Sequence, residues 1–330
     1  MRHCGAEGLG GAVDKALGGA SRQSLGDRAV PRVRWRLNRE ALDGYLFILP
    51  WVIGFIALSA GPVLASLYLA FTDYELLKAP KFIGTRNFTK MFASDRVYWV
   101  SVANTAIYVG LYVPLHLVTA LLAAIALNVK VRGINIFRLI FFIPSITPLV
   151  ASIFLWMWIY NPDYGLANAL LDIVGLPPQK WLFDENLAKP SLVIMALWAF
   201  GSSMIIFLAG LQGIDQGLYE AAEIDGAAVM QRFRHITLPM LTPVIFFNLV
   251  LGIIGTFQVF TVAYVGTQGG PHNATRFYVL YLYEQGFAFL HMGFASAMAW
   301  VLFLFIMLLT LVQFWTATRW VYYETGSRGL

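Results

Sequence analysis

Residues 294–318 read FASAMAWVLFLFIMLLTLVQFWTAT, a run that contains no Asp, Glu, Lys or Arg. A helix needs about 20 apolar residues to cross a hydrocarbon core roughly 30 Å thick, and this run is long enough to do so. Trp315, Trp320, Tyr322 and Tyr323 lie at its end, where aromatic side chains mark a membrane–water boundary. The pattern predicts a membrane-spanning helix near the C-terminus.

Five further stretches of the same kind precede it, at 45–71, 100–127, 138–160, 191–212 and 241–266. Pro50, Gly61 and Pro62 interrupt the first, which neighbouring helices and water allow in membranes. Hydrophobic residues make up 58% of the 330 residues and charged residues only 12%, against roughly 25% charged in a soluble domain. The sequence therefore predicts an all-α integral membrane protein with six transmembrane helices.

The basic residues predict the orientation. Most of the 23 Lys and Arg lie in 1–43, 128–138, 213–240 and 319–330, which are the segments on one side of a six-span chain. The positive-inside tendency makes that side cytoplasmic, so both termini are expected inside. The first outer loop, 72–97, carries five basic residues and runs against the trend. We expect a largely disordered cytoplasmic tail over 1–43, a membrane domain over 44–323 and a short cytoplasmic tail over 324–330.

The connection between the fourth and fifth spans is unusually patterned. It reads GIDQGLYEAAEIDGAA over 213–228 and VMQRFRHITLPM over 229–240. Asp215 is a candidate N-cap for a short helix, Gly226 supplies a permissive backbone at its end, and a second helix leads to Pro239. A short helix of this kind, presented by a loop, suits docking in a groove of another protein.

This connection resembles the EAA loop of ABC importer permeases. The resemblance lies in YEAAEIDGA over 219–227, followed by Phe233, Ile236, Leu238 and Pro239, and is closest to the binding-protein-dependent sugar permeases of the maltose and glycerol-3-phosphate type. It implies a cytoplasmic coupling helix between helices 4 and 5 that sits in a cleft of a separate ATPase. The coupling residues it implies are Tyr219, Glu220, Ala221, Ala222, Asp225, Gly226, Ala227, Phe233, Leu238 and Pro239.

The same resemblance implies the partners: a second permease subunit in a heterodimer, two ATP-binding subunits docked on residues 215–240, and an extracytoplasmic solute-binding protein. Lipid would surround the chain, in the inner membrane of a prokaryote, and no nucleic acid would bind. ATP and Mg²⁺ would belong to the partner ATPases, because the chain has no Gly-Lys dipeptide and so no phosphate-binding P-loop. No cofactor, metal site or catalytic constellation is expected in this chain, so it is not expected to be an enzyme.

Polar and small residues inside the spans suggest a translocation pathway. Asn248, Gly252, Thr256 and Val259 recur at i, i+4, i+8 and i+11, on one face of a continuous helix. Resemblance to the maltose-type permease implies substrate-lining roles for the last three. On the fourth span, Trp198, Ser202 and Ser203 are further candidates. Close helix packing is the alternative role for small residues. Gln258 falls on another face of the expected helix and is predicted to be an interhelical hydrogen-bond partner or a pathway residue.

Three classes of function remain to be compared. An ATP-driven importer of a sugar or related polyol is favoured, with glycerol-3-phosphate or another non-sugar solute as the alternative cargo. A secondary transporter driven by an ion gradient would need carboxylates inside the spans, and those spans contain no Asp or Glu. A membrane-bound enzyme or scaffold has no residues in its support.

Overall fold

The computed structural model describes residues 39–129 and 131–322, with side chains from residue 42 onward. The chain divides into two units, Met1–Ser59 and Ala60–Leu330. In the first unit, helix α2 spans Arg39–Phe55 and contains Pro50, and a π-helical turn, η1 (Ile56–Ala60), follows it. The rings of Trp51 and Phe55 stack on α2 with centroids 5.4 Å apart.

The second unit is almost entirely helical. Its single two-stranded antiparallel sheet in the described residues pairs β1 with β2, with Thr72 opposite Phe82. In chain order, the elements are α3 (Gly61–Ala70), β1 (Thr72–Asp73), β2 (Lys81–Phe82), α4 (Arg86–Ala93), α5 (Arg96–Leu127), α6 (Ile134–Ile146), α7 (Leu149–Ile159), α8 (Leu166–Ile173), η2 (Trp181–Phe183), α9 (Ala188–Leu197), α10 (Gly201–Gln212), α11 (Gln216–Ile224), α12 (Val229–Arg232), η3 (Phe233–Thr237), α13 (Leu238–Met240), α14 (Thr242–Phe257), α15 (Thr261–Gly266), α16 (Tyr278–Tyr283), η4 (Glu284–Ala288) and α17 (Met292–Trp320).

Three helical segments among the described residues are long and apolar enough to cross a membrane unbroken: Leu42–Ala70, Arg96–Leu127 and Met292–Trp320. Three helix pairs pass the same test together but bend at a short break, by 98° between α6 and α7, 51° between α9 and α10, and 60° between Val229–Met240 and α14. By length and composition, the count is therefore three spans, or up to six when each bent pair is one span.

The breaks have local causes. Pro148 is the N-cap of α7, and the preceding Thr147 takes the extended conformation that a residue before proline prefers. Gly201 begins α10, and a Cβ there would lie 2.5 Å from the Phe141 carbonyl oxygen, so the glycine lets α10 approach α6 closely. Between α14 and α15, the backbone leaves the helix over residues 258–260. The sequence prediction contains none of these three breaks, since it continues one helix across each of 138–160, 191–212 and 241–266.

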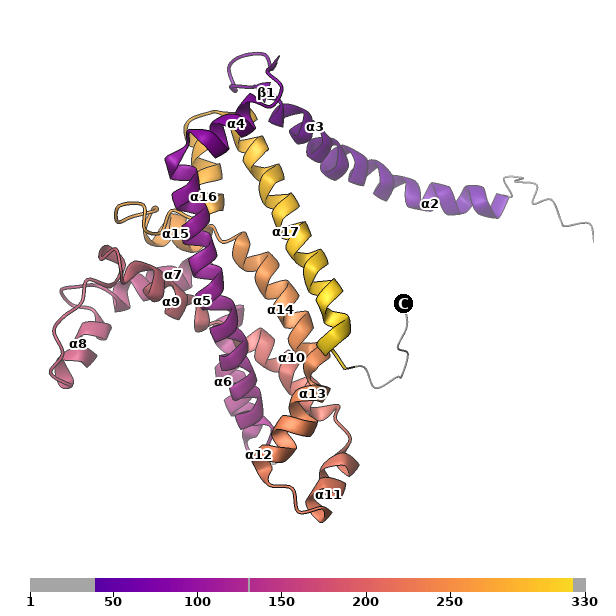
Figure 1. Ribbon diagram of the computed structural model, residues 1–330, viewed down its shortest axis with the longest axis vertical. Helices are drawn as coiled ribbons and strands as arrows, with labels where there is room; N and C mark the ends of the chain where they lie inside the picture. The colour runs from indigo at the N-terminus through magenta and orange to yellow at the C-terminus, as the bar shows by residue number, and fades with distance from the viewer. Residues whose placement is uncertain (1–38, 130, 323–330) are drawn as a thin grey trace, which may run out of the picture. The chain divides into compact units, whose positions relative to one another are not determined.

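Three hydrophobic clusters hold the second unit together. One joins α3, α4, α5, α16 and α17 around Met91 and Met298, and a second joins α5, α7, α9 and α15 around Ile153 and Leu192. The third, which we call the basal cluster, consists of Ala120, Ala124, Leu127, Met204, Phe207, Leu208, Leu211, Ile214 and Leu241. In Figure 1, α11 and α12 lie at one end of this unit, α4, β1 and α16 at the other, and α5 runs between the two ends.

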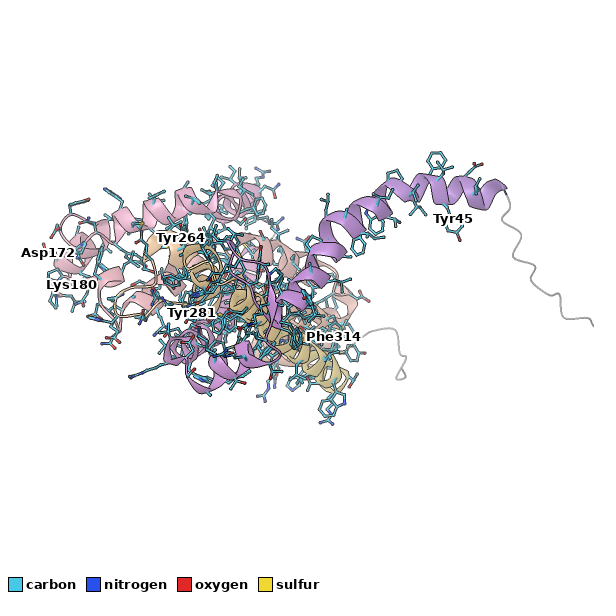
Figure 2. The ribbon with its side chains drawn as sticks, turned by 90° about the horizontal axis from the view of Figure 1, so that it is seen from above. Tyr45, Asp172, Lys180, Tyr264, Tyr281 and Phe314 are labelled. Atoms are coloured by element: carbon cyan, nitrogen blue, oxygen red, sulfur yellow. The ribbon has the colours of Figure 1, made fainter. Side chains whose placement is uncertain are left out.

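The end that carries α16 is also fixed by polar contacts to α5. The Asn104 side chain donates to the Asn273 carbonyl over 2.6 Å, and the Thr105 hydroxyl accepts from the Tyr278 backbone N–H over 2.8 Å. Lys189 of α9 donates to the Asn104 side-chain oxygen at 2.9 Å. In the view from above, Asp172 and Lys180 mark the α8–η2 hairpin, well away from the helices around Tyr264 and Tyr281 (Figure 2).

Candidate functional site

The connection at 213–240 folds into the helix–bend–helix that its sequence predicts. The Asp215 carboxylate accepts from the Gly217 N–H at 2.9 Å and so caps the N-terminus of α11. At the other end, Gly226 takes a φ of +76°, its N–H donates to the Glu223 carbonyl, and the Ala227 N–H donates to the Ala222 carbonyl. These two bonds form a Schellman motif, which ends α11 at a fixed residue.

A second set of contacts holds α12 at a fixed angle to α11. The Ala228 backbone N–H donates to the Gln231 side chain at 2.7 Å at the start of α12. Arg232 then pairs with Glu223 across the bend at 3.1 Å. Because Glu223 is largely exposed, we assign this pair only about 0–1 kcal/mol. The pair therefore contributes little to the stability of the fold.

Tyr219 anchors this loop to the body of the unit. Its hydroxyl lies 2.9 Å from the Thr237 hydroxyl, across the bend, and its ring packs on the basal cluster together with Ile236. Thr237 is buried, and the backbone then leads through α13, with Leu238 and Pro239, to α14. Helix α11 is therefore joined to α10 and α14 by packed side chains as well as by the backbone of the loop.

The tip of the loop exposes apolar side chains. Ile224, Val229 and Met230 are 87%, 74% and 71% exposed, on either side of the Gly226 bend. Exposed apolar side chains are common singly, but here three of them lie within seven residues of one bend. Of the predicted coupling residues, Glu220, Ala221, Asp225 and Gly226 are also exposed, while Tyr219, Ala222, Ala227, Phe233 and Pro239 are half-buried and Leu238 is at the limit of exposure.

The second candidate feature is a cavity of about 530 Å³. It lies where the α6–α7, α9–α10 and α14–α15 breaks converge on one wall of α5. Irregular backbone in a membrane protein belongs next to a cavity or buried in protein, because lipid cannot satisfy its hydrogen bonds. Thr147, Gln258 and Thr261 lie in or directly after these breaks, and all three line the cavity.

The structure places four of the seven predicted pathway residues on this cavity: Trp198, Gly252, Thr256 and Val259. The Thr256 hydroxyl donates to the Gly252 carbonyl at 2.6 Å, so its proton is already used within its own helix. Asn248 is buried outside the cavity, where its amide donates to the Val244 carbonyl at 2.9 Å. Ser202 is exposed and Ser203 is half-buried, and both lie outside the cavity lining.

The expected single face of Asn248, Gly252, Thr256 and Val259 does not exist as one helical stripe. Helix α14 ends at Phe257, so Val259 reaches the cavity from the break that follows. The same break turns Gln258 into the cavity lining, although a continuous helix would place it on another face. The C-cap of α14 is Gln258, and no Pro or Gly stands at that position to mark the helix end. The sequence alone therefore did not indicate the break.

Sequence reasoning missed the α5 wall, which contributes Tyr108, Tyr112 and His116 at i, i+4 and i+8. The spacing was visible, but aromatic residues in an apolar span are indistinguishable from packing residues. In the structure, His116 bridges two helices: its Nε2 lies 2.9 Å from the Ser203 hydroxyl of α10, and its Nδ1 lies 3.2 Å from the Tyr112 hydroxyl.

Within the described residues, no group of three His, Cys, Asp or Glu side chains is arranged to hold a metal ion. The cavity lining is mostly apolar, and among its aliphatic side chains it carries aromatic rings, hydroxyl groups, one amide and one imidazole. An apolar lining with a few polar groups is typical of small-molecule sites.

Comparisons with known proteins agree on the family. Residues 116–321 match the family described as the binding-protein-dependent transport system inner membrane component. The chain is 45% identical to the probable ABC transporter permease protein YesP of Bacillus subtilis, over 88% of this chain and 94% of that protein. It is 36% identical to the lactose transport system permease protein LacF of Rhizobium radiobacter, over 84% of this chain and 94% of that one.

The fold also matches a solved structure. A chain of a bacterial alginate ABC transporter, crystallised with an alginate pentasaccharide-bound periplasmic protein, superposes with a TM-score of 0.77. That match covers 88% of this chain and 98% of the other at 23% identity, so it supports the fold alone. Together, the family match and the two relatives establish that this chain belongs to the inner membrane components of binding-protein-dependent transport systems, the permease subunits of ABC transporters.

Proposed function

We propose that this chain is a permease subunit of an ATP-driven importer for a sugar or related polyol, delivered by an extracytoplasmic binding protein. The observation that carries the cargo class is similarity over most of the chain to permeases named for lactose, for trehalose and maltose, and for arabinooligosaccharides, at 36%, 38% and 35% identity. The aromatic and hydroxyl-bearing cavity suits such a solute.

In this proposal, α6–α7 and α9–α10 are each one bent transmembrane segment, and the fifth segment begins at α14. With the three unbroken helical segments this gives six spans, with both termini in the cytoplasm of a prokaryote. The family description, an inner membrane component, supports the membrane. The membrane domain would occupy 44–323, between cytoplasmic tails at 1–43 and 324–330. Residues 1–38 of the N-terminal tail, with the disorder predicted for them, and the C-terminal segment 324–330 lie outside the described residues, while 39–43 belong to α2.

Helix α11 is then the cytoplasmic coupling helix between the fourth and fifth spans. The exposed apolar side chains of Ile224 at the end of α11 and of Val229 and Met230 in α12 would seat in a groove of one ATP-binding subunit, while a second permease subunit engages the other. ATP and Mg²⁺ would be held by those ATPases. When they close on ATP, movement of α11 would pass through the Tyr219–Thr237 contact and the basal cluster to α14 and α10.

Both helices border the cavity or lead directly into it. The cavity would consequently alternate between the two sides of the membrane as the packed base shifts between two arrangements. A loosely binding cavity suits this cycle, since a solute bound tightly in every state could not leave. Selectivity would then rest mainly on the binding protein.

The test uses proteoliposomes that contain the whole complex: this chain, its partner permease, both ATPases and the binding protein. ATP-dependent uptake of radiolabelled lactose, maltose, trehalose or arabinotriose is the expected result. Glu220→Lys, on the exposed docking side of α11, should abolish uptake while the chain still inserts and is recovered from the membrane. Uptake without ATP, or uptake unaffected by Glu220→Lys, would contradict the proposed coupling.

A further inference from the structure

The α5 wall of the cavity carries a feature that the proposed pathway does not use. Tyr112 and His116 sit one helical turn apart, both partly accessible and both in the cavity lining. Their rings lie 5.1 Å apart between centroids and tilt by 34°. Tyr108, one turn earlier and almost fully buried, stacks on Tyr112 at 5.8 Å with an interplanar angle of only 4°. Tyr108, Tyr112 and His116 therefore form a row of three neighbouring rings along α5.

The hydrogen bonds fix the imidazole from both of its nitrogens. Ser203 of α10 meets Nε2 at 2.9 Å, and the Tyr112 hydroxyl meets Nδ1 at 3.2 Å. A neutral imidazole donates from one nitrogen and accepts at the other. The three groups consequently form a short chain, Ser203–His116–Tyr112, whose direction depends on the tautomer.

Either direction leaves the Tyr112 hydroxyl with unused hydrogen-bonding capacity. If Nδ1 carries the proton, it donates to the phenolic oxygen, and the Tyr112 O–H remains free to donate. If Nε2 carries the proton, it donates to Ser203, the Tyr112 O–H donates to Nδ1, and the phenolic oxygen remains free to accept. The Tyr112 hydroxyl, at the cavity end of this hydrogen-bonded series, can thus present a donor or an acceptor.

A sugar hydroxyl is itself both donor and acceptor, and a pyranose ring offers an apolar face next to its hydroxyls. A ring platform with a hydroxyl that serves in either sense matches both properties. We propose that Tyr112 and His116 form a saccharide subsite on the α5 wall: Tyr112 hydrogen-bonds a sugar hydroxyl, the two rings contact the sugar face, and Ser203 acts as a positioning residue for the imidazole.

This inference rests on the proposed function, since it names a cargo-binding position within the same pathway. It also gives Ser203 a role different from the direct lining role expected from sequence. Ser203 would act behind His116, and its effect on transport would be indirect.

The test measures uptake and ATP hydrolysis together in the complete complex, with radiolabelled lactose, maltose, trehalose and arabinotriose as probes. Tyr112→Phe keeps the ring and removes only the hydroxyl. Loss of one hydrogen bond worth about 1 kcal/mol should lower uptake of the transported probe roughly five- to tenfold, while the ATPase activity stimulated by the binding protein stays near the wild-type rate. Ser203→Ala should give a smaller loss, with the same unchanged hydrolysis.

Thr119→Val is the matched control. Thr119 lies on the same helix, outside the cavity lining, and spends its hydroxyl on the Leu115 carbonyl, so its uptake should stay at the wild-type level. If Tyr112→Phe and His116→Phe both transport as Thr119→Val does, the subsite is refuted and the importer proposal stands. If both lose uptake and hydrolysis in parallel, the two residues serve only the structure, and the subsite is again refuted. A wild-type complex that takes up none of the probes refutes the saccharide cargo itself.

Discussion

At the scale of single residues, Gly226 is the most informative position. Its φ of +76° lies in the left-handed region, and no atom lies within 4 Å of where a Cβ would be. Any cost of substitution is therefore backbone strain rather than a clash, about 1–2 kcal/mol for most side chains. Asn tolerates this conformation better than other residues, which offers a comparison at the same site.

We expect Gly226→Asp to abolish uptake, because it strains the Schellman turn and adds a negative charge at the C-terminal end of α11. Gly226→Asn should retain most of the uptake. Both variants should insert in the membrane in normal amounts, as judged by immunoblot of membrane fractions. Equal loss in the two variants would mean that the added charge does not decide the outcome.

The residues of the bend were predictable from sequence because each carries a local signal: Asp215 for a cap, Gly226 for a left-handed turn, Pro239 for a new helix. The cavity was only partly predictable. Trp198, Gly252 and Thr256 reach it, but His116 and Gln258 reach it through tertiary contacts and a helix end that no short pattern reports. Asn248 shows the converse. It was predicted to line the pathway, but its amide donates to the Val244 carbonyl of its own helix, and it lies outside the cavity lining.

At the scale of elements, we propose that the loop at 213–240 docks through its tip. Ile224, Val229 and Met230 belong to two short helices on either side of the Gly226 bend, and all three side chains are exposed. Burying one such side chain contributes about 1.5–3 kcal/mol. The triple replacement Ile224→Ser, Val229→Ser and Met230→Ser should therefore weaken ATPase binding by at least about a hundredfold, at 1.4 kcal/mol for each tenfold change.

Copurification of a tagged ATPase with the permease measures this directly. Phe183→Ser, on the η2 segment at 66% exposure, is the control for replacing an exposed apolar residue elsewhere, and it should leave copurification unchanged. Retention of the ATPase by the triple variant would show that another surface of this chain holds it.

The helix breaks are the elements that sequence patterns described least well. Hydropathy found α6–α7, α9–α10 and α14–α15 each as one apolar stretch, because a bend does not change composition. Pro148 gave a local signal for the 98° bend, whereas the α9–α10 bend depends on how closely Gly201 approaches α6. The cavity lies at these bends. Sequence patterns could therefore indicate which spans line it, but not which of their side chains do.

At the scale of the whole molecule, the remaining question is which end faces the cytosol. The loop at 213–240 and the α8–η2 hairpin lie on different connections of the chain, and the proposed six spans would place those connections on opposite sides. The five basic residues of 72–97 oppose the positive-inside trend, so charge alone is weak support for this orientation.

Cysteine labelling decides the orientation with two positions. Cys4 is the single cysteine of the chain, so a Cys4→Ser background carries no competing thiol. In it, Ile224→Cys should react with a membrane-impermeant maleimide only in inside-out vesicles stripped of ATPase, and Phe183→Cys only in right-side-out vesicles, since both side chains are well exposed. The reverse pattern would put α11 on the wrong side for ATP-driven coupling. Labelling of both positions from one side would instead remove one crossing between residues 183 and 224, and with it the reading of α9 and α10 as a single bent span.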